Sequence, residues 1–253
     1  MAGTAAHMAA AFSPEPCLDI ESITWKNIIR SGAREMGLQI DDRAIDQFAV
    51  HAAELLKWNR KINLTAITDP LEMAAKHYLD SIAPSAMIPA HISLLDMGSG
   101  AGFPGIPLKI VNPSLSVTLI DASRKKISFL NHIIRRLGLR GTSAVQGRVE
   151  AMAPSTAHPG FGDPDWTGFN VIVCRALTDL SDFIRDAWPL LDEAGFLLAF
   201  KGRGEQAEKE IDCFVSQDHP PELLIAPKEI RIASRSYRLP YLGSERTIVR
   251  VSR

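Results

Sequence analysis

A short apolar run that ends in three alternating glycines constrains the possible folds of this chain more than any other segment does. The run Leu94-Leu-Asp-Met97 leads into Gly98, Gly100 and Gly102, and a run that stops at glycines is typical of a buried strand. Glycine permits a positive φ and leaves room for a ligand against the backbone. The segment therefore predicts a strand, a tight turn and a helix, with a ligand bound at the turn.

Strand and helix patterns alternate after residue 91. A helical apolar pattern runs from Ile127 to Leu137 and stops at Gly138, and short apolar runs predict strands at 92–96, 117–121, 143–146, 169–174 and 195–200. Strands that alternate with helices form a parallel sheet covered on both faces. Two further segments, 222–232 and 247–251, are expected to pair antiparallel at the sheet edge. The predicted fold class is α/β, with a mostly parallel seven-stranded sheet.

The first 90 residues lack this alternation and predict helices. The apolar spacing indicates one helix over 20–36, a second that is capped by Asp41 or Asp42, and a third that starts at Asp69-Pro70. The segment 153–168, rich in proline and glycine, is expected to be a loop. We therefore divide the chain into three parts: a tail at 1–18, a helical N-terminal extension at 19–90 and a ligand-binding domain at 91–253.

Composition excludes several classes of protein. Hydrophobic residues make up 46% and charged residues 23% of the 253 residues, which is typical of soluble globular proteins. No apolar stretch reaches about 18 residues, so we expect no membrane span. The three cysteines form no C-x-x-C pair, which predicts reduced thiols in a cytoplasmic protein and no metal site.

The formal net charge of −1 conceals an uneven distribution. Between Ala122 and Val149 seven residues are basic and none is acidic, and a basic face is typical of a protein that binds a polyanion such as RNA. The apolar residues of the helix in this segment are expected to face the sheet, so its cations should point away from the ligand crevice. The candidate RNA contacts are Arg124, Lys125, Arg135 and Arg136 of this segment, together with Lys201 further along the chain.

An acidic residue ends the predicted strand that follows the glycines. Asp121 lies 19 residues after Gly102, where a carboxylate can accept hydrogen bonds from the ribose hydroxyls of an adenosine. The glycine order differs from G-x-G-x-x-G, which places a pyrophosphate at a helix N-terminus, and Asp96 suits a ligand that carries an amino acid group. The pattern resembles the first motif of class I S-adenosylmethionine-dependent methyltransferases. A nicotinamide-dependent oxidoreductase and a non-catalytic RNA-binding module are the alternatives from other classes.

Further blocks extend the resemblance to one family. The string GSGAGFPGIP at 98–107 resembles the signature of the bacterial 16S rRNA guanine-N(7) methyltransferases, also called glucose-inhibited division protein B. The other similar blocks are Trp58–Ala66, His77–Ser81, Gly147–Glu150, Cys174–Ala176 and Lys201-Gly202. The resemblance covers about residue 45 to the C-terminus. The chain departs from the family pattern at Asn170, where aspartate is expected and where we interpret the residue as a cap, and in the loop 153–168.

The resemblance implies a fold, a cofactor and a reaction. The fold would be the Rossmann-like class I methyltransferase fold, the cofactor S-adenosylmethionine and its product S-adenosylhomocysteine. The reaction would be methylation of ring nitrogen 7 of guanine 527 in 16S rRNA. The partner would be the small ribosomal subunit, without a membrane, and the protein would be a monomer. A class I methyltransferase acting on another RNA or on a small molecule is the alternative.

The resemblance also assigns roles to residues. Arg175 would be catalytic, and the cofactor contacts would be Gly98, Gly100, Gly102, Phe103, Asp121, Ser123, Val149, Glu150 and Arg175. The sequence Cys174-Arg-Ala176 stands where methyltransferases of exocyclic amines have D/N-P-P-Y, which favours a ring nitrogen as the acceptor. His77 and Asp80 either help to close the site or pack and cap their helix.

Overall fold

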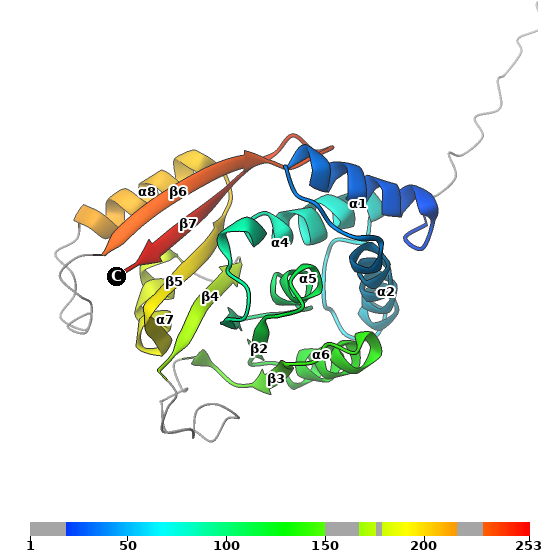
Figure 1. Ribbon diagram of the computed structural model, residues 1–253, viewed down its shortest axis with the longest axis horizontal. Coiled ribbons are helices and arrows are strands. Elements are labelled where there is room, and N and C mark those ends of the chain that lie inside the picture. The colour runs from blue at the N-terminus through cyan, green and yellow to red at the C-terminus, as the bar shows by residue number, and fades with distance from the viewer. Residues whose placement is uncertain (1–18, 150–166, 176–178, 217–229) are drawn as a thin grey trace, which may run out of the picture.

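The computed structural model describes residues 19–149, 167–175, 179–216 and 230–253. The expected tail at 1–18 and most of the expected loop 153–168 lie outside these residues. Within the described part, a seven-stranded sheet carries helices on both faces (Figure 1). No helix of the described residues is both long and apolar enough to cross a membrane.

The sheet has the strand order β3-β2-β1-β4-β5-β7-β6. The first five of these strands are parallel, and β7 runs antiparallel to both β5 and β6, which confirms the mostly parallel sheet. Its strands are β1 Ser93–Met97, β2 Ser116–Asp121, β3 Thr142–Gln146, β4 Phe169–Arg175, β5 Leu191–Lys201, β6 Arg231–Arg238 and β7 Glu245–Ser252. The strand order reverses between β1 and β4, and ligands of such sheets bind beyond the carboxyl ends of the strands at that reversal.

Each face of the sheet has its own hydrophobic core. Helices α5 (Gly105–Val111) and α6 (Arg124–Leu137) pack against β1, β2 and β3 on one face. Helices α7 (Leu180–Ala187) and α8 (Gly204–Ser216) pack on the other face, against β5 and β7 (Figure 1). Two short 3₁₀ helices, η2 (Ser85–Met87) and η4 (Trp188–Leu190), complete the connections on the two sides.

The N-terminal helices begin at side-chain caps. Helix α1 (Ile23–Glu35) is capped by Ser22, and α2 (Asp42–Asn59) by Asp41, whose side chain accepts the Ala44 N–H at 2.7 Å. Asp69 caps a third helical segment by accepting the Glu72 N–H at 2.8 Å. The caps at Asp41 and Asp69 confirm two expected starts, whereas α1 begins three residues later than the expected residue 20. The third segment is a continuous run of three elements, α3 (Pro70–Glu72), the π-helix η1 (Met73–Leu79) and α4 (Asp80–Ile82).

The N-terminal helices share one core with the sheet. Trp25, Phe48 and Tyr78 are fully buried and belong to the same cluster as Phe129 of α6 and Val171 of β4. Because this apolar surface is continuous, the helices of 19–90 form the outer layer over α5 and α6. They also border the carboxyl ends of the strands, because Arg175 at the end of β4 contacts Lys76 and His77 of η1.

Two strand predictions were wrong in position. Strand β5 begins at Leu191, four residues earlier than expected, because its pairing with β4 shifts register around Gly195. A Cβ at Gly195 would lie 2.9 Å from the Asn170 carbonyl oxygen, so the irregularity requires glycine. Strand β6 spans 231–238, whereas 222–232 was expected, and residues 222–229 of that prediction lie outside the described part.

Asn170 ties two strands together at their starts. Its side-chain oxygen accepts hydrogen bonds from the Ser93 N–H and the Ser93 hydroxyl, each at 3.0 Å. The residue thus bridges β4 to β1, at the amino ends of these parallel strands. The departure from the family pattern at this position therefore lies at the opposite end of the strands from the predicted site.

Candidate active site

The glycine loop after β1 has the backbone that the sequence predicts. Gly98, Gly100 and Gly102 all have positive φ, at 69°, 57° and 92°, a conformation that other residues rarely adopt. A Cβ at Gly102 would lie 2.5 Å from Cγ1 of Ile106, so this glycine is also needed for packing against α5. The loop is joined to β2 because the Ser99 N–H donates to the Ile120 carbonyl at 2.9 Å.

The carboxylate of Asp121 is held in place at the end of β2. One oxygen accepts the Ser123 N–H at 2.8 Å, and the other accepts the Gly100 N–H at 3.1 Å and lies 3.3 Å from Nζ of Lys126. An ionised carboxylate has about four lone-pair positions, so these contacts leave acceptor capacity for a ligand. The structure thus brings Gly100 and Asp121, both predicted contacts, into direct contact with each other.

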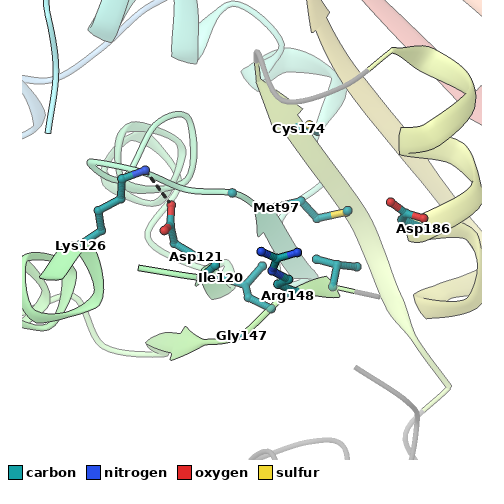
Figure 2. A pocket seen from close by; sticks show the side chains of 11 residues that line it. Met97, Ile120, Asp121, Lys126, Gly147, Arg148, Cys174 and Asp186 are labelled. Carbon is teal, nitrogen blue, oxygen red and sulfur yellow. Dashed lines mark hydrogen bonds and ion pairs between the residues drawn. The ribbon is translucent and has the colours of Figure 1, made fainter. Parts of the chain in front are cut away.

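A first hollow of about 350 Å³ opens beside Asp121, at the carboxyl ends of β1, β2 and β4 (Figure 2). It is lined by Met97, Gly98, Ile120, Asp121, Ala122, Lys126, Gly147, Arg148, Val149, Cys174 and Asp186. Of the predicted cofactor contacts, Gly98, Asp121 and Val149 line this hollow. Glu150 lies outside the described residues.

Several lining residues escaped the sequence analysis. Met97 and Ile120 immediately precede predicted contacts, so their places at strand ends were a usable signal. Asp186 comes from α7, on the opposite side of the hollow from Asp121 in Figure 2, and has no local motif. The expectation that all cations of α6 point away from the crevice was wrong for Lys126, because its position in the first turn lets its long side chain reach Asp121.

Other predicted residues do not line the first hollow. Ser123 lines a second hollow, on the far side of Lys126. Phe103 is buried and packs against helix η1. Lys201 forms an ion pair with Glu210 at 2.6 Å, and its side chain is 11% exposed. Arg124, Lys125, Arg135 and Arg136 are exposed on α6.

Arg175, at the end of β4, is bound to the N-terminal helices. Its guanidinium donates to the Lys76 carbonyl at 2.7 Å and to Nδ1 of His77 at 3.2 Å, and it lies 3.4 Å from the Asp80 carboxylate. The buried Asp80 also accepts the Tyr237 hydroxyl at 2.6 Å. This network fixes β4, η1, α4 and β6 relative to one another at the carboxyl edge of the sheet.

His77 connects this network to the glycine loop. Its ring stacks on Phe103, with centroids 4.4 Å apart and planes 12° apart. Burial, and then the positive charge of Arg175, lower the pKa of His77 to about 3, so the ring is neutral. Since Nδ1 accepts from Arg175, the proton lies on Nε2, which is 2.9 Å from the Thr65 hydroxyl. His77 and Asp80 therefore pack and brace the wall next to the loop.

Asp96 faces the interior rather than the hollow. Its side chain is fully buried, and one oxygen accepts the Gly105 N–H at 2.9 Å. Burial raises the pKa of Asp96 to about 7, against the opposing effect of that hydrogen bond. The carboxyl thus fastens the start of α5 to β1, and the interpretation of Asp96 as suited to a ligand gains no support from this position.

The described residues contain no group of three His, Cys, Asp or Glu side chains that could bind a metal ion. The site instead combines a glycine backbone, an anchored carboxylate and apolar walls. Ile120 and Val149 supply aliphatic surface on which a planar base can lie.

A solved structure shares this architecture. The SAM-dependent methyltransferase from Aquifex aeolicus matches with a TM-score of 0.50 and 16% identity, over 79% of this chain and 97% of that chain. At this identity the likeness shows the fold alone. The sheet order, the two helical layers and this match give the protein the Rossmann-like class I methyltransferase fold.

Sequence relatives narrow the class to one family. The family described as rRNA small subunit methyltransferase G matches residues 44–222. Ribosomal RNA small subunit methyltransferase G of Geobacter sulfurreducens is 39% identical over 224 residues, 88% of this chain and 95% of the relative. The protein of the same name from Geotalea uraniireducens is 43% identical over 227 residues, 89% of this chain and 95% of the relative. The chain belongs to the rRNA small subunit methyltransferase G family.

Proposed function

We propose that this protein transfers a methyl group from S-adenosylmethionine to ring nitrogen 7 of a guanine in 16S rRNA, at the position 527 that the family resemblance implies. The observation that carries the proposal is the anchored Asp121 beside the glycine loop, in a chain of this family. When bound, S-adenosylmethionine supplies an activated methyl group on sulfur and leaves as S-adenosylhomocysteine.

The residues of the first hollow fit this cofactor. Asp121 would accept hydrogen bonds from the ribose hydroxyls, for which its carboxylate retains acceptor capacity. Ile120 and Val149 would contact the adenine, and Gly98 would allow the backbone to approach the methionine part. Ser123 supports Asp121 through its N–H, so its contribution to the cofactor would be indirect. Glu150, which the family resemblance places at the adenine, stays part of the proposal.

The reaction does not require the protein to remove a proton from the substrate. Nitrogen 7 of guanine has a free lone pair and no proton to lose, so catalysis consists of aligning nucleophile, methyl group and sulfur and of excluding water. Arg175 would act by fixing the wall against which the guanine is oriented, since it binds Lys76 and His77 of η1. Its Cζ lies 5.4 Å from the ring centroid of Phe103, which belongs to the same wall. Phe103 would hold that wall against the loop by stacking on His77, and Gly102 would let the loop pack closely on α5.

The exposed cations of α6 would bind RNA phosphates. Arg124, Lys125, Arg135 and Arg136 are exposed, and no acidic residue occurs between Ala122 and Val149. Lys201 would contribute less, since Glu210 neutralises it.

The cellular setting follows from the substrate. A protein that modifies the small ribosomal subunit would work in the cytoplasm. We also propose that it acts as a monomer, because only three large apolar side chains of the described residues are exposed, Ile23, Val215 and Tyr241.

The test is methyl transfer to small ribosomal subunits from a strain that lacks this gene. Radioactive methyl from S-adenosylmethionine should be retained in 16S rRNA, and mapping should place it on nitrogen 7 of one guanine. Label retained at another base or in another RNA would contradict the proposed substrate but keep the class. No label, together with NADH oxidation, would contradict the class.

A further inference from the structure

A second hollow, of about 300 Å³, lies next to the first and is not used by the proposed cofactor contacts. It forms between the segment that follows α2 and the first turn of α6, and is lined by Lys61, Ile62, Asn63, Leu64, Ser123, Lys125 and Lys126. Lys126 lines both hollows, so a ligand in the second would lie beside the cofactor site.

The second hollow has an unbalanced positive charge. Neither Lys61 nor Lys125 forms an ion pair with any residue that the structure describes. Lys126 lies 3.3 Å from Asp121, but that carboxylate also accepts two backbone N–H groups. Three ammonium groups therefore line one hollow, and only that of Lys126 has an acidic partner among the described residues, so an anion would be attracted to the space between them.

The hollow also offers neutral hydrogen-bond donors. Ser123 is the N-cap of the 14-residue helix α6, yet its side chain makes no capping bond, so its hydroxyl is available. The Asn63 amide makes no hydrogen bond to another residue in the described ranges. The first N–H groups of α6 have no partner inside the helix, as at any helix N-terminus, and its dipole adds to the attraction of an anion.

The wall contributed by Lys61 to Leu64 is already ordered. The Asn59 side chain accepts the N–H of Leu64 at 2.7 Å and that of Thr65 at 3.0 Å, and it donates to the Thr65 carbonyl at 2.9 Å. Ile62 and Leu64 pack against the main core. A ligand would thus bind without first ordering this segment, which lowers the entropic cost of binding.

We infer that the second hollow binds one backbone phosphate of the RNA substrate, close to the guanine that receives the methyl group; this inference rests on the proposed function. S-adenosylmethionine carries no phosphate, so the cofactor does not account for three lysines here. A phosphodiester matches the site because it brings one negative charge, several acceptor oxygens and an adjacent sugar that Ile62 and Leu64 can contact.

The experiment compares two charge-matched double variants with the wild type. Lys61→Gln with Lys125→Gln removes two cations from the second hollow. Lys26→Gln with Lys209→Gln removes two cations from α1 and α8, which line neither hollow. Lys61, Lys125 and Lys209 are exposed, and among the described residues Lys26 pairs only with the exposed Asp46, so both variants should fold. Lys126 is kept because it contacts Asp121.

Two readouts use small subunits from the strain that lacks this gene: equilibrium binding without cofactor over a range of KCl concentrations, and KM for the subunits in methyl transfer. The hollow variant should bind about tenfold more weakly at low salt, the factor expected for one charge-assisted contact. The slope of the logarithm of its binding constant against the logarithm of the KCl concentration should be smaller in magnitude by about 0.7 to 0.9, the value for one phosphate. The control variant should match the wild type, and KM for S-adenosylmethionine should stay unchanged in both.

The outcomes separate this inference from the proposed reaction. If the wild type methylates the subunits and the hollow variant behaves like the control, the phosphate site is overturned and the reaction stands. If no methyl is transferred, but the hollow variant alone binds subunits more weakly and with a smaller salt dependence, the phosphate site stands and the proposed reaction fails. Adenosine 5′-monophosphate tests whether the phosphate of a free nucleotide binds in the second hollow instead. If the wild type and the control variant bind this nucleotide tightly and the hollow variant does not, while the hollow variant still binds subunits like the wild type, the hollow is a nucleotide site. That result would overturn the RNA assignment.

Discussion

Replacing Asp96 with asparagine should remove a pH dependence of stability that the buried carboxyl creates. Burial raises the pKa of this group from 3.8 to about 7, and the hydrogen bond from the Gly105 N–H is the largest effect that opposes the shift. The second carboxyl oxygen has no hydrogen-bond partner among the described residues. Asparagine has the same shape, keeps an acceptor for the Gly105 N–H and does not titrate.

The magnitude follows from the difference in pKa. Because the pKa is higher in the folded protein than in the unfolded chain, the folded protein binds the proton more tightly, and the free energy of unfolding falls as the pH rises from 3.8 to about 7. Each pH unit in that interval costs about 1.36 kcal/mol. Between about pH 5.5 and 8.5 the wild type should therefore lose about 2 kcal/mol that the Asp96→Asn variant does not lose.

Urea denaturation of both proteins at several pH values in this range measures the effect. The difference between their free energies of unfolding isolates Asp96, because every other titrating group, including the buried His51 and His77, is common to both. The difference should move in favour of the variant as the pH rises and become constant above about pH 7. A difference that is the same at every pH would refute the argument, since it would mean that the carboxyl ionises alike in the folded and unfolded chains.

Two further substitutions test the site, and a third tests the packing at the start of α5. Asp121→Asn should weaken S-adenosylmethionine binding about ten- to hundredfold, because a charge-assisted hydrogen bond contributes about 1.5–3 kcal/mol; calorimetry showing unchanged affinity in the folded variant would remove Asp121 from the site. Arg175→Ala should lower the rate of methyl transfer by a larger factor than it lowers the folding equilibrium constant. The reason is that Arg175 holds Lys76, His77 and Asp80 in place beside the glycine loop. Turnover at the wild-type rate would leave Arg175 with a structural role only. Gly105→Ala should lower the free energy of unfolding by about 1–3 kcal/mol, because the added Cβ would lie 2.4 Å from Cδ2 of Leu119 and 2.7 Å from the Asp96 carboxylate. Gly202→Ala, whose Cβ would meet nothing nearer than 4.0 Å, is the matched control, and equal losses in the two variants would contradict this account of Gly105.

Features that depend on neighbouring residues could be predicted from the sequence. The cap at Asp41, the helix start at Asp69-Pro70 and the end of α6 at Gly138, which has φ of 62°, each arise from contacts within about four residues. The same holds for the glycine loop, because its positive φ values require glycine wherever the chain is placed. The parallel orientation of the first five strands, but not their order in the sheet, followed from the alternation of strands and helices.

Positions set by register were not readable from local patterns. The shift at Gly195 lengthens β5 because the backbone of β4 approaches it closely, and β6 pairs along residues 231–238 because β7 lies beside it. Both depend on segments far away in the chain. Strand propensity marks where a strand is favoured but not where its pairing begins.

Which side chains meet was decided by the tertiary structure. The sequence placed Gly98, Asp121 and Val149 at strand ends, and the parallel sheet brings such ends together. It gave no sign that Lys126 would reach back to Asp121 or that Arg175 would bind η1. The physical reason is that a long side chain can reach partners in several directions, and only the packed helices and strands around it determine which carboxylate or carbonyl is within hydrogen-bonding distance.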